Sequence, residues 1–399
     1  MHVVADTEQL VTDGVINEAQ AEEIRKRGRQ AMMALAINSI LSFGILAATL
    51  GLIFWLGNAA AVAVFGLAML IGGMAILFAG GEMYRMFGNA AALIGAGMLI
   101  GGAAVELLDK YESSAGPVMT LGGAILVVVF TMAFLRARDT AAFVTGTILL
   151  MGFAFHLVGL GFWMEQAGQT GLTKALFFLY AAAALAGLGW FVDVRLITAF
   201  AIVPFAQALD TGTAYFHAMY VFYSPEPTLS ILQMALLMTV TLLIVRHRPE
   251  RLARHARILA ILGFIVANLC ALVGSLWGDV VGETMWGPQR AAFTGDGSWD
   301  AWRAAREAWR ETAIEISEGA FTVFWAVALA GMIAYSAWRG HRGLFNTAIT
   351  FAAIHAYTQL FESFGDEPLA YVIGGLAAIP LAWGMWRLDH WMTSQTEAG

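Results

Sequence analysis

The segment Arg246–Arg257, RHRPERLARHAR, decides how this sequence folds. It has five arginines in twelve positions, and a long apolar run lies on each side of it. A segment this basic is excluded from hydrocarbon, so we expect it to be a loop between two membrane spans. The positive-inside rule then places the loop in the cytoplasm, and the orientation of every other span follows by alternation.

The composition is that of an integral membrane protein. Hydrophobic residues make up 59% of the 399 positions and charged residues 13%, whereas soluble chains average about 45–50% and about 25%. The apolar runs are long and continuous, which favours helices over an outer-membrane barrel. The net charge of −7 gives no reason to expect a nucleic-acid partner. The chain lacks a Walker A loop and an HExxH motif, so neither ATP-driven transport nor standard metalloprotease chemistry is expected.

The apolar runs predict an all-α bundle of about twelve transmembrane helices, each near the roughly 20 residues needed to cross a bilayer. The predicted spans are 33–56, 59–80, 86–108, 116–136, 140–163, 172–192, 195–212, 226–245, 257–278, 318–338, 343–362 and 367–387. Alternation from the arginine-rich segment places both termini in the cytoplasm. Arg85, Arg136, Arg195, Arg339 and Arg387 then fall on the cytoplasmic side, as the positive-inside rule requires.

Two parts of the chain are expected to stand apart from the spans. Residues 1–31 predict a cytoplasmic helical hairpin in front of the bundle of residues 32–399, and Asn17 and Gln20 have the spacing of a helix capping box. Residues 279–317 predict an outer-face segment, in which tryptophans recur near helical spacing over 299–316. That pattern is typical of an amphipathic helix on a membrane surface. It would act as a lid or as a gate, and both it and the hairpin are candidate surfaces for a protein partner.

Polar side chains inside the predicted spans mark the candidate site, because such groups are costly in hydrocarbon and usually serve a function. His355, Gln359 and Glu362 recur at i, i+4 and i+7 and therefore share one helix face. The remaining candidates lie in the outer parts of three other spans and are His156, Gln207, Asp210 and Asn268.

This asymmetry predicts a polar pocket that opens to the outer face, in a carrier or receptor-like protein for a small solute or ion. The residues expected to bind substrate or protons are Asp210, His355 and Glu362, with Gln359 on the same face. Those expected to orient them are Gln207, Asn268 and His156. Pro204, one turn before Gln207, predicts a kink that would expose backbone groups.

Two other functions stay open. One is a non-catalytic membrane scaffold or assembly factor. The other is a membrane enzyme or haem protein at the outer face, since His156 and His355 lie at similar depth and two histidines can ligate one haem iron. The chain has no haem-attachment motif, and either histidine is also explained as a hydrogen-bonded contact between helices.

Two stretches resemble a known family. They are LVTDGVINEAQAEEI at 10–24 and FNTAITFAAIHAYTQLFES at 345–363, in which Asn346, Tyr357, Phe361 and Glu362 are the matching positions. Together they resemble the bacterial membrane proteins catalogued as domain of unknown function twenty-one fifty-seven. Ala356 and Thr358 stand where that family would have an arginine. The resemblance implies a multi-pass protein of a bacterial inner membrane and implies no activity.

Overall fold

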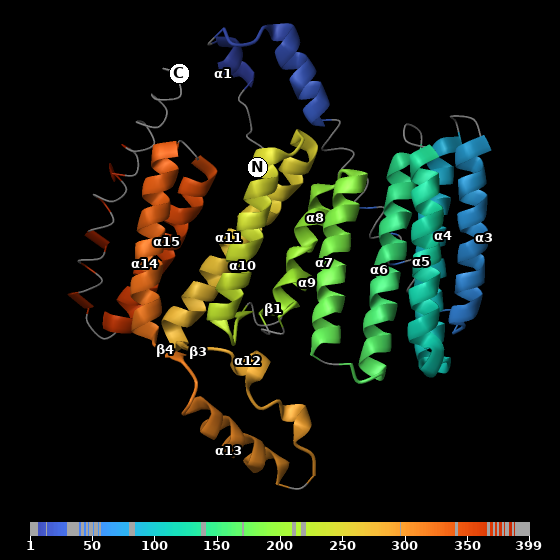
Figure 1. Cartoon of the computed structure of the whole chain (residues 1–399). Coiled ribbons are helices and arrows are strands. Elements are labelled where there is room, and N and C mark those ends of the chain that lie inside the picture. Colours follow the sequence, from blue (N-terminus) through green and yellow to red (C-terminus); the bar gives the residue numbers. More distant parts are fainter. Residues whose placement is uncertain are drawn as a thin grey trace. The chain divides into compact units, whose positions relative to one another are not determined.

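The computed structural model describes most of the chain. The described residues are 7–12, 14–29, 57–79, 84–136, 141–169, 171–209, 213–216, 221–295, 297–339 and 342–364, with single positions between 40 and 55 and between 368 and 387. The chain divides into two compact units, Met1–Gly168 and Gln169–Gly399. The described residues are almost all helical, with two short two-stranded ribbons in the second unit (Figure 1).

The N-terminal segment forms two short helices, α1 (Thr7–Thr12) and residues 18–29. The turn between them contains Gly14 in the left-handed region, with φ of 70°. The predicted capping box is present: the backbone N–H of Asn17 donates to Oε1 of Gln20 at 2.9 Å, and that of Gln20 donates to Oδ1 of Asn17 at 2.8 Å. These two bonds satisfy donors that the helix itself leaves free.

Four long helices make up the rest of the described part of unit 1. They are α3 (Ala59–Ala79), α4 (Arg85–Lys110), α5 (Glu112–Arg136) and α6 (Ala142–Gln166). Helix α3 packs along α4, and α5 packs along α6. Glycine permits both close approaches, because a Cβ on Gly73 would overlap the backbone nitrogen of Ala92 and one on Gly123 would overlap that of His156.

Unit 2 is less regular. Its helices are α7 (Leu172–Val192), α8 (Arg195–Phe200), α9 (Ile202–Gln207), α10 (Pro227–His247), α11 (Glu250–Trp277), α12 (Glu283–Trp286), α13 (Ser298–Arg310), α14 (Glu318–Arg339) and α15 (Arg342–Phe364). Its ribbons pair β1 (Ala214–Phe216) with β2 (Val221–Tyr223), and β3 (Asp279–Val280) with β4 (Glu315–Ile316). Helix α11 packs against α10, α14 and α15.

The arginine-rich segment is mostly helical, so the expectation of a loop over all of Arg246–Arg257 was wrong. Helix α10 continues to His247 and α11 begins at Glu250, which leaves only Arg248 and Pro249 between them. Helices can extend past the hydrocarbon with charged ends, and a hydropathy pattern does not distinguish such an end from a loop.

The predicted span 195–212 is shorter than expected and is interrupted. It forms α8 and α9, which end at Gln207, and the break lies at Ala201. Pro204 has no N–H to donate to the carbonyl of Phe200, so the helix loses a bond at that point. The chain then continues into the β1–β2 ribbon instead of completing a span (Figure 1).

Eight helices among the described residues are long and apolar enough to cross a membrane. They are α3, α4 from Phe87, α5, α6, α7, α10, α11 and α14. Phe324 on α14 is 73% exposed and Ile125 on α5 is 63% exposed, as side chains that face lipid would be. The predicted span 343–362 forms α15, which is not among the eight, and 33–56 and 367–387 lie outside the described residues except for single positions.

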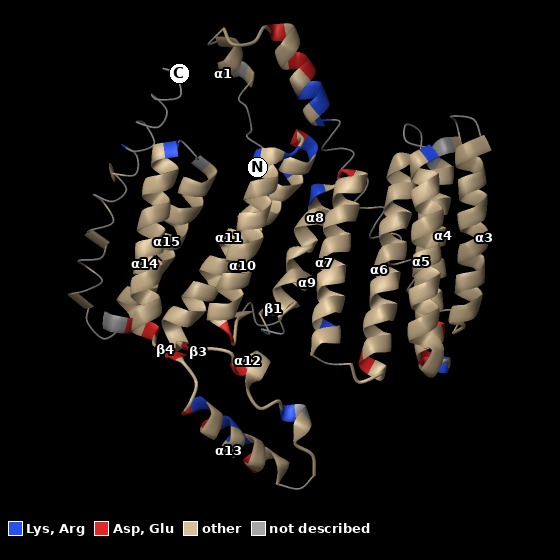
Figure 2. Ribbon diagram, in the orientation of Figure 1, with Lys and Arg blue, Asp and Glu red and all other residues tan. Residues whose placement is uncertain are grey.

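Charged residues of unit 2 divide between the two ends of its helices. Arginines gather where α10 meets α11, and Arg195 at the start of α8 lies at the same end (Figure 2). At the opposite end lies the β3–β4 ribbon, which contains Asp279 and Glu315. This is the end to which α12 and the amphipathic helix α13 are attached.

Candidate functional site

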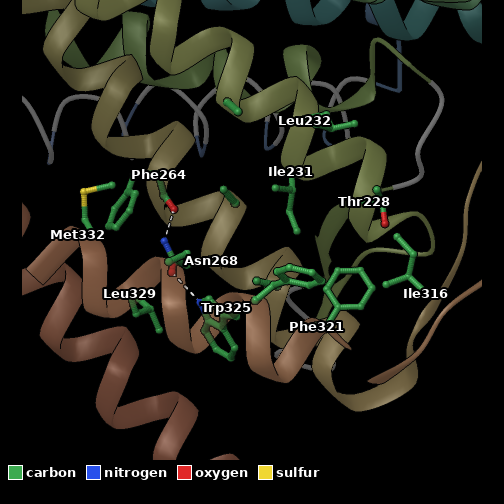
Figure 3. Close-up of a pocket in the computed structure, with 15 residues that line it drawn as sticks. Thr228, Ile231, Leu232, Phe264, Asn268, Ile316, Phe321, Trp325, Leu329 and Met332 are labelled. Carbon is green, nitrogen blue, oxygen red and sulfur yellow. Dashed lines mark hydrogen bonds between the residues drawn. The ribbon is translucent and has the colours of Figure 1, made fainter. Parts of the chain in front are cut away.

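A pocket of about 470 Å³ lies in unit 2 between α10, α11 and α14. Its wall is almost entirely apolar, and among the described residues Thr228 and Asn268 are the only polar ones that line it (Figure 3). Other lining residues are Ile231, Leu232, Phe264, Ile316, Phe321, Trp325, Leu329 and Met332. The arrangement suits a molecule with an apolar body better than a free ion.

Asn268 provides an amide group in the pocket wall. The residue is buried and only 6% exposed. The Nδ2 group donates to the carbonyl of Phe264 at 2.8 Å, and Oδ1 accepts from Nε1 of Trp325 at 2.9 Å (Figure 3). These bonds fix the amide at the contact between α11 and α14. An amide has more lone pairs and N–H groups than these two bonds use, so Asn268 has capacity for a ligand.

His355 and Gln359 lie behind Trp325, on α15. The rings of His355 and Trp325 meet edge to face with centroids 4.6 Å apart. Nδ1 of His355 and Nε2 of Gln359 are both buried and have no hydrogen-bond partner in the part of the chain that the structure describes. Each such atom is costly unless something satisfies it. The structure thus brings together three of the predicted site residues, Asn268, His355 and Gln359, around a tryptophan.

Gln207 belongs to a different polar cluster. Its amide donates to the carbonyl of Thr213, whose hydroxyl lies 3.0 Å from that of Ser224 and 2.6 Å from that of Ser230. All three hydroxyl residues are buried. Gln207 therefore fixes the irregular backbone that follows α9, and Asp210, its expected neighbour, lies outside the described residues.

His156 lies in unit 1 and has a structural environment. Its Nδ1 is 2.8 Å from the carbonyl of Thr120 on α5, and its ring stacks on Phe153 at 6.1 Å. His355 lies in unit 2, so the two histidines belong to different units. The described residues contain no group of three or more histidine, cysteine, aspartate or glutamate side chains placed to hold a metal ion. A haem between these histidines stays a prediction.

Glu362 does not join the interior cluster. It is exposed on α15, as are Tyr357 and Phe361, whose rings meet with centroids 4.5 Å apart. The i, i+4, i+7 spacing placed Glu362 on the face of His355, but it lies near the end of the described helix. Its side chain is therefore solvent- or lipid-facing in the described part of the chain.

A third polar cluster lies at the arginine end of unit 2. His255 is fully buried, with Nδ1 2.6 Å from the hydroxyl of Thr198 and Nε2 3.0 Å from Oδ1 of Asp193. The hydrogen bond from His255 lowers the pKa of Asp193. Arg251 donates to the carbonyls of Trp190 and Phe191, the last turn of α7.

These bonds satisfy carbonyls that the end of α7 leaves free, and they attach that end to α11. A threonine, a histidine and an aspartate in series also resemble a hydrolase triad. Thr198 is however buried, and it does not line the pocket between α10, α11 and α14. We therefore interpret the cluster as structural.

Sequence reasoning missed two features of the site. Trp325 lies within the predicted span 318–338 and no role was predicted for it, although a buried tryptophan N–H usually needs an acceptor. Glu226 is the first residue of the predicted span 226–245, and an acidic residue directly before a proline indicates the start of a helix. Neither signal identifies the residue, far along the chain, that Trp325 or Glu226 contacts.

No family model, no curated protein and no solved structure matches this chain. The family resemblance of 10–24 and 345–363 therefore stays a prediction.

Proposed function

We propose that this chain is a carrier or receptor-like membrane protein that binds a small molecule with an apolar body and one polar end. The pocket between α10, α11 and α14 carries the proposal. Its apolar wall would hold the body of the ligand, and Asn268 would bind the polar end. His355 and Gln359 would support Trp325 from α15 and would respond to a movement of its side chain.

The proposal differs from the sequence-based hypothesis in the kind of ligand. That hypothesis required several ionisable groups around a polar cavity, whereas the pocket has one amide and one hydroxyl. A fatty acid, an isoprenoid or a similar amphipathic metabolite fits such a wall. The volume is within the range of about 300–1,000 Å³ typical of small-molecule sites.

We further propose a bacterial inner membrane as the location, with about twelve spans and both termini in the cytoplasm. The eight apolar helices support a bilayer environment. The arginines at the α10–α11 end of unit 2 support placing that end in the cytoplasm. The pocket then lies nearer the outer leaflet. Thr228 is at the start of α10 and Ile316 is in β4, and both lie at the end of unit 2 opposite the arginines.

A palmitate analogue that carries a photoreactive diazirine tests the proposal. Irradiation of the purified full-length chain should attach the probe to peptides of α11 and α14, as located by mass spectrometry. Ala328 is exposed and lines the pocket, so Ala328→Phe should block most of this labelling. Asn268→Leu should weaken binding about fivefold, the effect of one hydrogen bond of about 1 kcal/mol.

The matched control is Ala330→Phe, because Ala330 is exposed on the same helix and does not line the pocket. It should label like the wild type. Equal labelling of the Ala328→Phe and Ala330→Phe proteins would mean that the probe only partitions onto the lipid-facing surface, and the proposal would be wrong.

An assembly role is the second candidate, and one observation favours it. Trp299 on α13 is 55% exposed, and two guanidinium groups lie near its ring centre, that of Arg290 at 4.8 Å and that of Arg303 at 5.5 Å. Exposed tryptophan and arginine are typical of protein-binding surfaces. Isolation in mild detergent should then recover a stoichiometric partner that Trp299→Ala releases.

A further inference from the structure

Two carboxylates are buried together at the end of unit 2 opposite the arginines. Glu226 precedes α10 and is 0% exposed, and Asp279 follows α11 and is 5% exposed. We call them the carboxylate pair. Within the described chain, no basic side chain forms an ion pair with either of them, because the nearby arginines, Arg306 and Arg310, bind Glu283 instead.

Backbone N–H groups hold the carboxylate pair in place. The N–H of Thr228 donates to Oδ2 of Asp279 at 2.8 Å, so Asp279 caps the start of α10. The N–H groups of Gly282 and Thr284 donate to the carboxylate of Glu226, the latter at 2.9 Å, so Glu226 caps α12. Each acid thus caps the helix that begins beside the other acid.

These hydrogen bonds do not offset the free-energy cost of burying two negative charges. Burial raises the pKa of Asp279, and burial raises that of Glu226, with a further increase from the charge of Asp279. Two carboxylates taken out of water need a counter-charge, and an unpaired buried charge is strongly disfavoured. The described side chains provide none.

Further oxygen atoms lie beside the pair. Among the described residues, Oδ1 of Asp279, Oγ1 of Thr228 and Oγ1 of Thr284 are buried and form no hydrogen bond of good geometry, although each hydroxyl is close enough to its carboxylate to lower the pKa of that acid. Thr228 is the residue whose N–H binds Asp279, and Thr284 is the one whose N–H binds Glu226. Each carboxylate therefore has a threonine hydroxyl beside it, and the set contains only oxygen ligands.

We propose that Glu226, Asp279 and the hydroxyls of Thr228 and Thr284 bind a hard divalent cation, Ca²⁺. Oxygen ligands from carboxylates, hydroxyls and backbone suit Ca²⁺, which accepts irregular geometry. Mg²⁺ keeps several waters in an octahedral shell and fits a buried site less well. Zn²⁺ prefers nitrogen and sulfur, and neither histidine nor cysteine belongs to the set. A divalent ion also neutralises both charges, whereas Na⁺ would leave one.

The position of this site gives it a consequence for the pocket. Thr228 belongs to both, and Asp279 pairs in the β3–β4 ribbon with Ile316, which lines the pocket. Binding of the cation would fix the start of α10 and the ribbon, and so the end of the pocket. The cation site itself does not depend on the proposed ligand.

Terbium luminescence tests the site in the full-length chain. Trp286 packs on Gly282, whose N–H binds Glu226, so excitation of tryptophan should sensitise a Tb³⁺ ion bound there. After removal of metal by a chelator, we expect saturable Tb³⁺ emission that Ca²⁺ displaces and that Mg²⁺ at the same concentration does not. The unfolding temperature should rise with added Ca²⁺.

Asp279→Asn keeps an oxygen for the Thr228 N–H and removes the charge, so it should weaken Ca²⁺ binding at least tenfold. Glu311→Gln, which changes an exposed acid on the same outer segment, should have no effect. Thr228→Val and Thr284→Val keep every charge and every capping bond, and each should weaken Ca²⁺ binding several-fold. These two variants carry the test if Asp279→Asn does not fold.

Three results would overturn the proposal: no Ca²⁺-displaceable emission in the wild type, equal affinity in the wild type and all three variants, or an unfolding temperature that depends on pH and not on Ca²⁺. The last result would mean that the pair shares a proton. Photolabelling of the pocket by the palmitate probe is read separately, so failure of one proposal leaves the other standing.

Discussion

Unit 1 and unit 2 hold their apolar helices together in different ways. In unit 1 the helix pairs α3–α4 and α5–α6 pack through glycines, and the polar contact of His156 with the carbonyl of Thr120 joins adjacent helices of one pair. The hydroxyl of Thr120 donates to the carbonyl of Gly116 in its own helix. In unit 2 polar side chains join elements that are far apart in the sequence, as Asn268 joins Trp325 and Asp279 joins Thr228.

The difference supports placing the proposed binding sites in unit 2. Close packing of backbones needs only small residues and leaves little space for a ligand. Interrupted helices, ribbons and buried polar groups are costly unless they serve a purpose, and in membrane proteins they commonly mark binding sites. We therefore expect unit 1 to be sensitive to changes of shape and unit 2 to be sensitive to changes of chemistry.

The largest expected effect is on the packing of unit 1. Gly73→Ala places a Cβ against the backbone of Ala92 and should destabilise the protein by about 2–3 kcal/mol, the cost of overpacking a rigid interface. The neighbouring Gly72 has nothing within 4 Å of such a Cβ, so Gly72→Ala should be neutral. Unfolding in mixed detergent micelles measures both. Equal effects would show that α3 and α4 do not pack as described.

The second prediction concerns a polar contact of unit 2. Asn268→Leu leaves the N–H of Trp325 buried without an acceptor and should cost about 2 kcal/mol. Trp325→Phe removes that N–H, so the double variant should be less destabilised than the sum of the two single variants by about 1 kcal/mol. Additive effects would mean that the hydrogen bond contributes nothing.

The sequence was sufficient to predict most of the helices. Residues 172–192 form α7 as predicted, and the hydrophobic run of 318–338 forms α14. Hydropathy is a property of each segment by itself, so a single sequence reveals it. The capping box at Asn17 and the interruption near Pro204 are also local, since both depend on residues within one or two turns.

The site was predicted only in part, because its residues meet across the chain. Asn268 and His355 were identified by their cost in hydrocarbon. Trp325, which lies between them, was not, since its role depends on the rotation of α14 against α11 and α15. Glu226 and Asp279 are separated by two spans, and only the fold brings them together. Sequence periodicity gives the face of one helix and not the helix that it meets.

The third prediction compares acids at the same end of unit 2. Burial raises the pKa values of Glu226 and Asp279. Stability from such groups is present at low pH and lost as the pH rises through the folded-state pKa. Burial also raises the pKa of Glu283, but Arg310 and Arg306 outweigh this and lower it. Its contribution is present above the unfolded value of 4.5 and is lost as the pH falls through the lower folded-state value.

Thermal unfolding against pH in the presence of a chelator measures both limbs. Asp279→Asn should flatten the fall in stability above the ordinary range of carboxyl groups, and Glu283→Gln should flatten the fall on the acid side. Exposed Glu311→Gln is the control and should alter neither limb. The same curve for all four proteins would show that these acids titrate as they do in the unfolded chain.

The smallest expected effect is the coupling between the two proposed sites of unit 2. If Ca²⁺ fixes Thr228 and the strand of Ile316, it should tighten binding of the palmitate probe by roughly fivefold, at the low end of measured couplings. By linkage, the probe should tighten Ca²⁺ binding by the same factor. Thr228→Val should reduce the coupling more than Thr284→Val does, because only Thr228 lines the pocket. Equal coupling in the two variants would mean that the cation acts on the pocket by a route other than the start of α10.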